Sequence, residues 1–195
     1  MLDNKNVLLG VTGGVAAYKA VDLASKLIAA GAKVTPVMTE NACRFVGPKS
    51  FEAVTCSAVC TDLWSPPEGH RIGHIALADW ADIVVVAPAT ANIIGKIANG
   101  ICDDLLSTTV CACWPLIQSG AVLIAPAMNE KMWANPVVKK NVGTIRDMGI
   151  QLVGPVEGRL ACGTKGLGRM SEPQEILEAI GKIESQIKRK KKTAK

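Results

Sequence analysis

The sequence holds few side chains that could do acid/base chemistry near neutral pH. Its only histidines are His70 and His74, and imidazole is the side chain whose unperturbed pKa puts its charge change between pH 5 and 8. His74 lies just before an apolar run that leads into a buried strand pattern. It is therefore a candidate for a proton-transfer step, although a histidine in such a place commonly has a structural role.

Cysteine is more abundant, and one of the seven cysteines stands apart. They occupy positions 43, 56, 60, 102, 111, 113 and 162 without a CxxC pair, which predicts reduced thiols rather than disulfides or a zinc site. Cys162 alone lies outside an apolar stretch, in a segment with glycine at 158, 163, 166 and 168. This composition predicts a mobile lid that presents Cys162 to a ligand, with a disordered connector as the alternative.

Asn129 is the third candidate, within the segment Pro-Ala-Met-Asn-Glu-Lys-Met-Trp at 126–133. An amide directly after a buried strand needs a partner, and a carboxylate or amide ligand would supply one. The neighbouring methionines and tryptophan are more commonly core residues. No G-x-S-x-G sequence and no metal-ligand spacing is present, so a serine hydrolase and a metal enzyme are disfavoured.

Two further loops could bind an anion. Gly13, Gly14 and Val15 form a glycine turn before a helix pattern, where backbone N–H groups can face a phosphate. The dinucleotide and Walker fingerprints are absent, which favours a mononucleotide or another monophosphate over a dinucleotide; a tight turn without a ligand is the alternative. The segment 88–92 follows the most apolar strand pattern, and Thr90 or Asn92 is expected to cap the next helix.

The elements that must position these loops alternate between strand and helix patterns. Strands with apolar residues on both faces, separated by helices, predict a parallel sheet covered on both sides, which is a doubly wound α/β fold. In that fold ligands bind at the carboxyl ends of the strands. Strands are expected at 7–11, 34–38, 82–87, 121–125 and 151–153, and helices at 15–30, 92–99, 104–118, 136–148 and from 173 onward, with Ser171 as its cap and Gln174 three residues on.

The length of 195 residues and a hydrophobic content of 49% fit one domain, which we place at 1–183, with a basic tail at 184–195. Six of the 22 basic residues occupy positions 188–192 and 195, so residues 1–187 hold 16 basic and 17 acidic groups. No nucleic-acid or membrane partner is expected, and the chain is predicted to be soluble and cytoplasmic. A surface loop is expected at 66–69.

Together these segments resemble the flavin-dependent cysteine decarboxylases, from about residue 6 to residue 180. The segment 126–133 is similar to the family's PxMNxxMW motif. Residues 160–163 and 168–170 are similar to its substrate-recognition clamp, while Gly13–Ala17, His74-Ile and 88–92 fit as well. The branch that acts on 4′-phosphopantothenoylcysteine is the most similar.

The resemblance implies a Rossmann-like or flavodoxin-like three-layer α/β/α subunit that binds FMN. It also implies homotrimers, or dodecamers built from trimers, with each flavin at a subunit boundary. His74 would be the catalytic base, Cys162 the proton donor, and Asn129 would hold the substrate carboxylate beside Met132, Ala161 and Gly163. The expected FMN contacts are Gly13, Gly14, Val15, Thr39, Glu40, Asn41, Thr90, Ala91, Asn92, Ile93 and Ala127.

The implied reaction releases CO2 from 4′-phosphopantothenoylcysteine and yields 4′-phosphopantetheine, a step of coenzyme A biosynthesis. In that family the cysteinyl side chain is oxidised to a thioaldehyde, which accepts electrons as CO2 leaves. The flavin then returns the hydride and Cys162 would give the proton. The family's PASANT is PATANI at 88–93 here, so Thr90 keeps a hydroxyl that Ile93 lacks.

Other interpretations stay open. A peptidyl-cysteine decarboxylase of the lantibiotic type shares the Asn129 motif, although the clamp favours the pantothenoyl substrate. A flavin prenyltransferase shares the fold but not the Asn129 and Cys162 segments. A non-catalytic flavin-binding regulatory protein and a flavodoxin-like electron carrier are alternatives without a reaction. A phosphopantothenate–cysteine ligase, fused or separate, is an expected partner.

Overall fold

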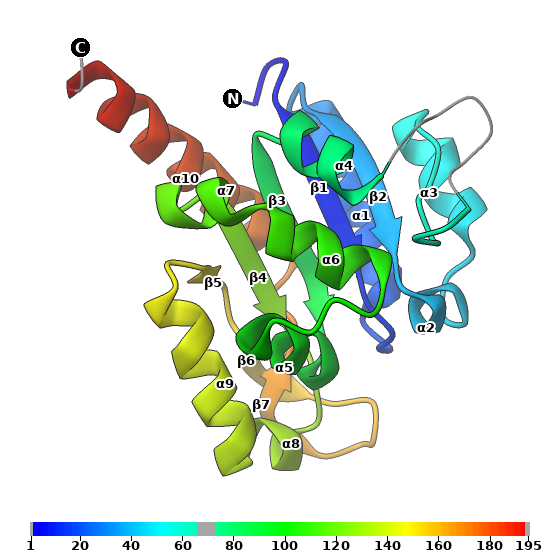
Figure 1. Cartoon of the computed structure of the whole chain (residues 1–195). Helices are drawn as coiled ribbons and strands as arrows, with labels where there is room; N and C mark the ends of the chain where they lie inside the picture. Colours follow the sequence, from blue (N-terminus) through cyan, green and yellow to red (C-terminus); the bar gives the residue numbers. More distant parts are fainter. Residues whose placement is uncertain (1, 66–72, 194–195) are drawn as a thin grey trace.

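The computed structural model describes residues 2–65 and 73–193, and side chains up to residue 189. The surface loop predicted at 66–69 and His70 lie outside the described residues. A five-stranded parallel sheet forms the centre of the molecule (Figure 1). Its strands are β1 (Asn6–Val11), β2 (Lys33–Met38), β3 (Ile83–Ala89), β4 (Val122–Pro126) and β5 (Gln151–Leu152).

The strand order is β2-β1-β3-β4-β5, and every neighbouring pair is parallel. This is the flavodoxin-like order, in which the direction of strand addition across the sheet reverses between β1 and β3. The predicted strands are therefore confirmed, each within two residues at either end. The order also brings the loops after β1 and β3 next to each other, because their strands are neighbours.

Helices cover both faces of the sheet, as the apolar strands require. On β1, Val7, Leu9 and Val11 pack into one core cluster, whereas Leu8 packs into the other. In Figure 1, α4, α6 and α7 cross in front of the sheet and α1 lies behind it. The helices are α1 (Ala17–Ala29), α2 (Glu40–Cys43), α3 (Pro48–Thr55), α4 (His74–Trp80), α5 (Ala91–Asn99), α6 (Leu105–Ala112), α7 (Trp114–Ser119), α8 (Glu130–Ala134), α9 (Pro136–Asp147) and α10 (Pro173–Thr193).

Two local predictions are wrong. The helix expected at 104–118 is split at Cys113 into α6 and α7, because Pro115 sits in the first turn of α7 and cannot donate a hydrogen bond to the end of α6. Ser171 does not cap α10. Its neighbour Glu172 takes that place, and its backbone N–H donates to the Glu175 carboxylate at 2.8 Å, while Ser171 is buried.

The glycine-rich segment forms a β-hairpin rather than a disordered connector, and its role as a mobile lid stays a prediction. Strands β6 (Val156–Arg159) and β7 (Lys165–Arg169) pair antiparallel. The Met128 N–H donates to the Gly168 carbonyl at 2.9 Å, and a Cβ on Gly168 would collide with the Met128 carbonyl oxygen. A Cβ on Gly166 would collide with the Glu130 carboxylate. These glycines permit close packing against the loop that carries Asn129. From composition alone, they had been interpreted as a source of flexibility.

The long helix α10 packs along α1 and runs without a break through residues 183 and 184. Glu184 is buried and forms ion pairs with Lys5 at 3.6 Å and with Lys188 at 3.1 Å. The boundary between a domain at 1–183 and a tail stays a prediction. Among the helices of residues 2–65 and 73–193, none combines the length and the apolar character that a membrane span requires.

Candidate active site

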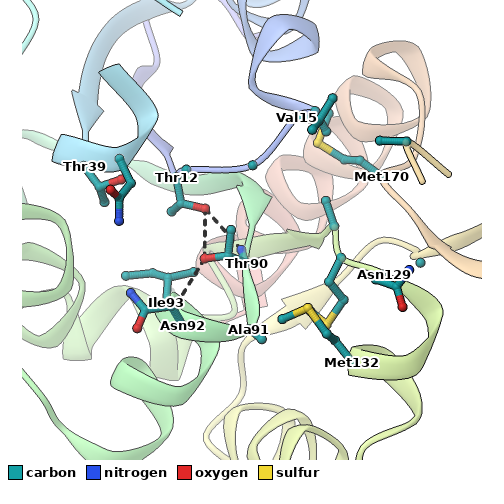
Figure 2. Close-up of a pocket in the computed structure, with 18 of the residues that line it drawn as sticks. Thr12, Val15, Thr39, Thr90, Ala91, Asn92, Ile93, Asn129, Met132 and Met170 are labelled. Atoms are coloured by element: carbon teal, nitrogen blue, oxygen red, sulfur yellow. Dashed lines mark hydrogen bonds between the residues drawn. The ribbon is translucent and has the colours of Figure 1, made fainter. Parts of the chain in front are cut away.

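A cavity of about 1130 Å³ opens at the carboxyl ends of the strands, where α1, α5, α8 and the β6–β7 hairpin meet. It gathers all eleven residues expected to contact FMN, together with Asn129, Met132, Ala161 and Cys162. Segments that lie 33 to about 150 residues apart in sequence thus share one site. Figure 2 shows Thr12 and Thr90 meeting on one side of it, with Met132, Asn129 and Met170 on another.

The glycine turn after β1 is held against the loop after β2. A Cβ on Gly13 would collide with Asn41, and only glycine therefore allows this approach. Thr39 caps α2, its hydroxyl accepting from the Ala42 N–H at 3.3 Å. The two loops form one wall of the cavity with polar groups on it.

Thr12 joins this wall to the loop after β3. Its buried hydroxyl donates to the Pro88 carbonyl at 2.7 Å and accepts from the Thr90 N–H at 3.1 Å. Thr90 caps α5, as predicted, and its hydroxyl accepts from the Ile93 N–H at 3.4 Å (Figure 2). Thr12 was not among the predicted site residues, although its place between the end of β1 and the glycine turn could have indicated a contact with the site.

Asn129 and Cys162 are brought into direct contact. The Asn129 side-chain oxygen accepts from the Lys131 N–H at 2.8 Å and caps α8, while its Nδ2 donates to the Cys162 Sγ at 3.2 Å. Thr164, which was not predicted, places its Oγ1 3.2 Å from the same sulfur. One hydrogen of the Asn129 amide is committed to the sulfur, and the second is free to reach a ligand in the cavity.

These contacts change the acidity of the thiol. The Thr164 hydroxyl and backbone N–H, followed by the Asn129 amide, stabilise the thiolate and hold the pKa of Cys162 below its usual value. Burial acts oppositely on two other thiols, raising the pKa of Cys60 to about 11 and that of Cys113 to about 12. Cys162 is thus an exposed thiol with a lowered pKa next to a cavity, the arrangement of a reactive cysteine.

A cluster of three charged side chains on the cavity wall was not predicted. Lys96 on α5 lies 2.6 Å from Asp103 and 2.6 Å from Asp104, and all three residues line the cavity. Burial alone would lower the pKa of Lys96, but the hydrogen bonds to both aspartates overcome it and raise the pKa. The ion pairs of Lys96 with these two aspartates join α5 to the start of α6.

Two predicted site residues lie outside the cavity. Gly163 is exposed in the turn of the β6–β7 hairpin, with a φ of 89° that favours glycine. His74 is half-buried at the start of α4, a helix that packs on α6 and leads into the amino end of β3. The roles of both residues stay predictions.

Comparisons with known proteins bear directly on this site. The Flavoprotein family matches residues 1–184. The chain belongs to the Flavoprotein family. The bifunctional coenzyme A biosynthesis protein CoaBC of Bacillus subtilis is 50% identical over 182 residues, which cover 93% of this chain and 44% of that protein. The chain therefore spans about half the length of the curated relatives it matches.

Solved structures of similar proteins agree with the assignment to the Flavoprotein family. A cysteine-to-serine mutant of PPC decarboxylase, complexed with pantothenoylaminoethenethiol, matches with a TM-score of 0.80 and 35% identity over 91% of this chain and 96% of that one. The FMN binding protein AtHal3 matches with a TM-score of 0.76 and 35% identity, over 91% of this chain and 95% of that one. The flavodoxin-like fold and the family resemblance are both confirmed.

The residues of this Flavoprotein-family site fit FMN. Hydroxyl groups of Thr39 and Thr90 and the N-terminal ends of α1 and α5 offer donors to a phosphate and a ribityl chain. Val15, Met132 and Met170 supply apolar surface of the kind that a planar ring system needs. At about 1130 Å³ the cavity is larger than most ligand pockets, which leaves space for a substrate beside Asn129 and Cys162.

Proposed function

We propose that this protein is an FMN-dependent decarboxylase that converts 4′-phosphopantothenoylcysteine into 4′-phosphopantetheine and CO2 in coenzyme A biosynthesis. The contact between Asn129 and Cys162 at the cavity wall carries the proposal, because it combines a carboxylate-binding amide with an acidic thiol in one place. The cysteine end of such a substrate carries a carboxylate and, after CO2 loss, needs a proton. The similarity to PPC decarboxylase supports the same reaction.

Each residue has a separate task in this reaction. FMN, when bound, supplies reversible two-electron chemistry at the substrate's cysteine side chain. Asn129 binds the carboxylate through the amide hydrogen that does not point at Cys162, and its cap on α8 fixes the direction of the amide. Cys162 gives its proton to the decarboxylated product, and the lowered pKa of its thiol makes that transfer easier.

The catalytic base requires a second subunit in this proposal. His74 lies outside the cavity of its own chain. Tyr18, Val15 and Met132 line the cavity yet are 61%, 55% and 48% exposed, so the cavity has an apolar rim that another copy could cover. We therefore extend the proposal to a homotrimer, or a dodecamer of trimers, in which His74 of one copy reaches the cavity of the next.

An absorption spectrum followed by one assay tests the proposal. Flavin bands in the purified protein, and one CO2 per 4′-phosphopantothenoylcysteine added, are the expected results. Cys162→Ser should still release CO2 but accumulate the enethiol, because the product lacks its proton donor. Normal formation of 4′-phosphopantetheine by Cys162→Ser would contradict the role of Cys162. A flavin-loaded protein that releases CO2 only from a cysteine-ending peptide would instead favour the lantibiotic-type reaction.

Two wider expectations belong to the same proposal. The B. subtilis relative is bifunctional, and a phosphopantothenate–cysteine ligase, fused or separate, is the partner that would make the substrate. All seven cysteines are free thiols, which supports a reducing compartment such as the cytoplasm. Co-purification with a ligase and cell fractionation test these two points.

A further inference from the structure

One wall of the cavity carries an excess of positive charge that the proposed chemistry does not use. Lys19 on α1 and Arg169 at the end of β7 both line the cavity. Their side chains meet on Glu172, with 2.8 Å from the Lys19 Nζ and 3.4 Å from the Arg169 Nη2 to the same carboxylate oxygen. Glu172 is not part of the cavity wall, so it anchors the two cations from behind.

The positions of both cations are well defined. The Lys19 side chain is only 12% exposed. The Arg169 side chain lies over Gly158, where a Cβ would come within 3.0 Å of Nε and 3.2 Å of Cζ, so glycine at 158 gives the guanidinium room to lie flat on β6. Arg159 on the same hairpin also lines the cavity and adds a third positive charge to this wall.

The charge of Lys96, the remaining cation on the cavity wall, is neutralised by two carboxylates. Lys96 is bonded to Asp103 and Asp104 at 2.6 Å each, and both carboxylates line the cavity beside it. A dianion in the cavity would therefore be repelled near Lys96 and attracted near Lys19 and Arg169.

We propose that Lys19 and Arg169 form a subsite for a phosphate monoester, which is the phosphorylated end of the substrate. This proposal rests on the proposed function. Guanidinium and ammonium groups are the usual partners of phosphate, and a guanidinium can bind it through two parallel hydrogen bonds. Glu172 keeps the two cations in place and leaves a net positive charge. The phosphate of FMN has donors elsewhere, at the Thr39 and Thr90 hydroxyls and at the N-terminal ends of α1 and α5.

The test compares binding with and without the phosphate. Calorimetric titration of the FMN-loaded protein with 4′-phosphopantothenate and with pantothenate, neither of which can react, measures the contribution of the phosphate alone. Arg169→Gln and Lys19→Gln should each weaken 4′-phosphopantothenate at least about tenfold, the loss expected for charge-assisted hydrogen bonds, and leave pantothenate unchanged. Arg146→Gln at an exposed position on α9 and Lys26→Gln at a half-buried, ion-paired position on α1 remove the same charges outside the cavity and serve as controls.

The outcomes separate the subsite from its alternatives. Equal weakening of both ligands by Arg169→Gln and Lys19→Gln would overturn the proposal, because the cations would then only support the hairpin. A lower affinity for FMN in these variants, with unchanged preference for the phosphorylated ligand, would also overturn it and assign the cations to the cofactor phosphate. Phosphate-dependent binding that the variants abolish, in a protein that releases no CO2, would support the subsite and reject the proposed decarboxylation.

Discussion

At the scale of single residues, the site depends on side chains with two simultaneous contacts. Asn129 caps α8 with its oxygen and donates to Cys162 with its nitrogen, so the same amide orients a helix and a thiol. Thr12 bonds both the Pro88 carbonyl and the Thr90 N–H. Because each contact fixes a rotamer, the groups facing the cavity are oriented before a ligand arrives.

Thr164→Val tests how the acidity of Cys162 is set. The valine removes the hydroxyl that does most to stabilise the thiolate, so the pKa of Cys162 should rise towards its usual value. A thiol that must give a proton works only below its pKa. The alkaline limb of 4′-phosphopantetheine formation should therefore move to higher pH in the variant.

The measurement is the pH dependence of iodoacetamide alkylation at Cys162, followed by peptide mapping. Thr144→Val, which changes the same residue type on α9 outside the cavity, is the control. An unchanged midpoint for Thr164→Val would mean that the Thr164 hydroxyl has no part in lowering the pKa.

At the scale of elements, the cavity is made from the ends of helices and strands, so its shape depends on how those ends are fixed. The junction of α5 and α6 shows this. Asp104 caps α6 by accepting from the Ser107 N–H at 2.8 Å and also bonds Lys96 of α5 at 2.6 Å. The hairpin shows it again, since its glycines allow β7 to lie against the Asn129 loop.

Two substitutions at Asp104 separate its cap from its ion pair. Asp104→Asn keeps a capping oxygen and loses the charge, whereas Asp104→Ala loses both. We expect Asp104→Asn to cost up to about 1 kcal/mol of unfolding free energy at pH 7, since solvent screens this half-buried group. Asp104→Ala should cost about 1 kcal/mol more. Urea unfolding at equal FMN loading measures both.

The loss of unfolding free energy in Asp104→Asn depends on pH in a direction that the structure predicts. Burial alone would raise the pKa of Asp104, but hydrogen bonds from Lys96 and from the Ser107 N–H lower it overall. A lowered folded-state pKa contributes stability above the unfolded value of about 3.9 and loses it as the pH falls through the folded value. The difference between wild type and Asp104→Asn should therefore shrink below about pH 4. A constant difference down to pH 2 would contradict this account.

At the scale of the whole molecule, one chain builds most of the site but not all of it. The cavity holds Asn129 and Cys162, whereas His74 lies outside it on α4. Exposed apolar residues around the cavity, such as Val15 and Tyr18, fit coverage by a second copy. An assembly in which each cavity borrows a histidine is the arrangement that we propose.

Mixed assemblies of two inactive variants test the borrowed histidine. His74→Asn should block the reaction before CO2 is lost, and Cys162→Ser should fail to form 4′-phosphopantetheine. When the two are co-expressed, roughly a quarter of the subunit boundaries in a randomly assembled trimer would pair an intact His74 with an intact Cys162. Formation of 4′-phosphopantetheine should return to about that fraction of the wild-type rate.

The control is a mixture of separately purified, unexchanged variants, which should stay inactive. Complete inactivity of the co-expressed assemblies, with light scattering showing that they are mixed trimers, would place both residues in the cavity of one chain. A monomer in light scattering would reject the assembly itself.

The framework of the fold follows from local patterns in the sequence. Apolar strands such as the one at 82–87 need cover on both faces, and the glycine turn, Thr90 and the Asn129 segment each follow a strand, so the fold and the end of the sheet that carries the site could be predicted. Local patterns of this kind act over a few residues and do not depend on distant partners.

Contacts between groups far apart in the sequence became clear only once the folded chain was known. Asn129 becomes a partner of Cys162 because the β6–β7 hairpin packs on the loop after β4, and Lys19 of α1 and Arg169 of β7 share Glu172 as an ion-pair partner. Gly158, Gly166 and Gly168 looked like sites of flexibility in the sequence, yet they are sites of close packing. Composition cannot separate these two uses of glycine, because close packing depends on what the rest of the chain places against it.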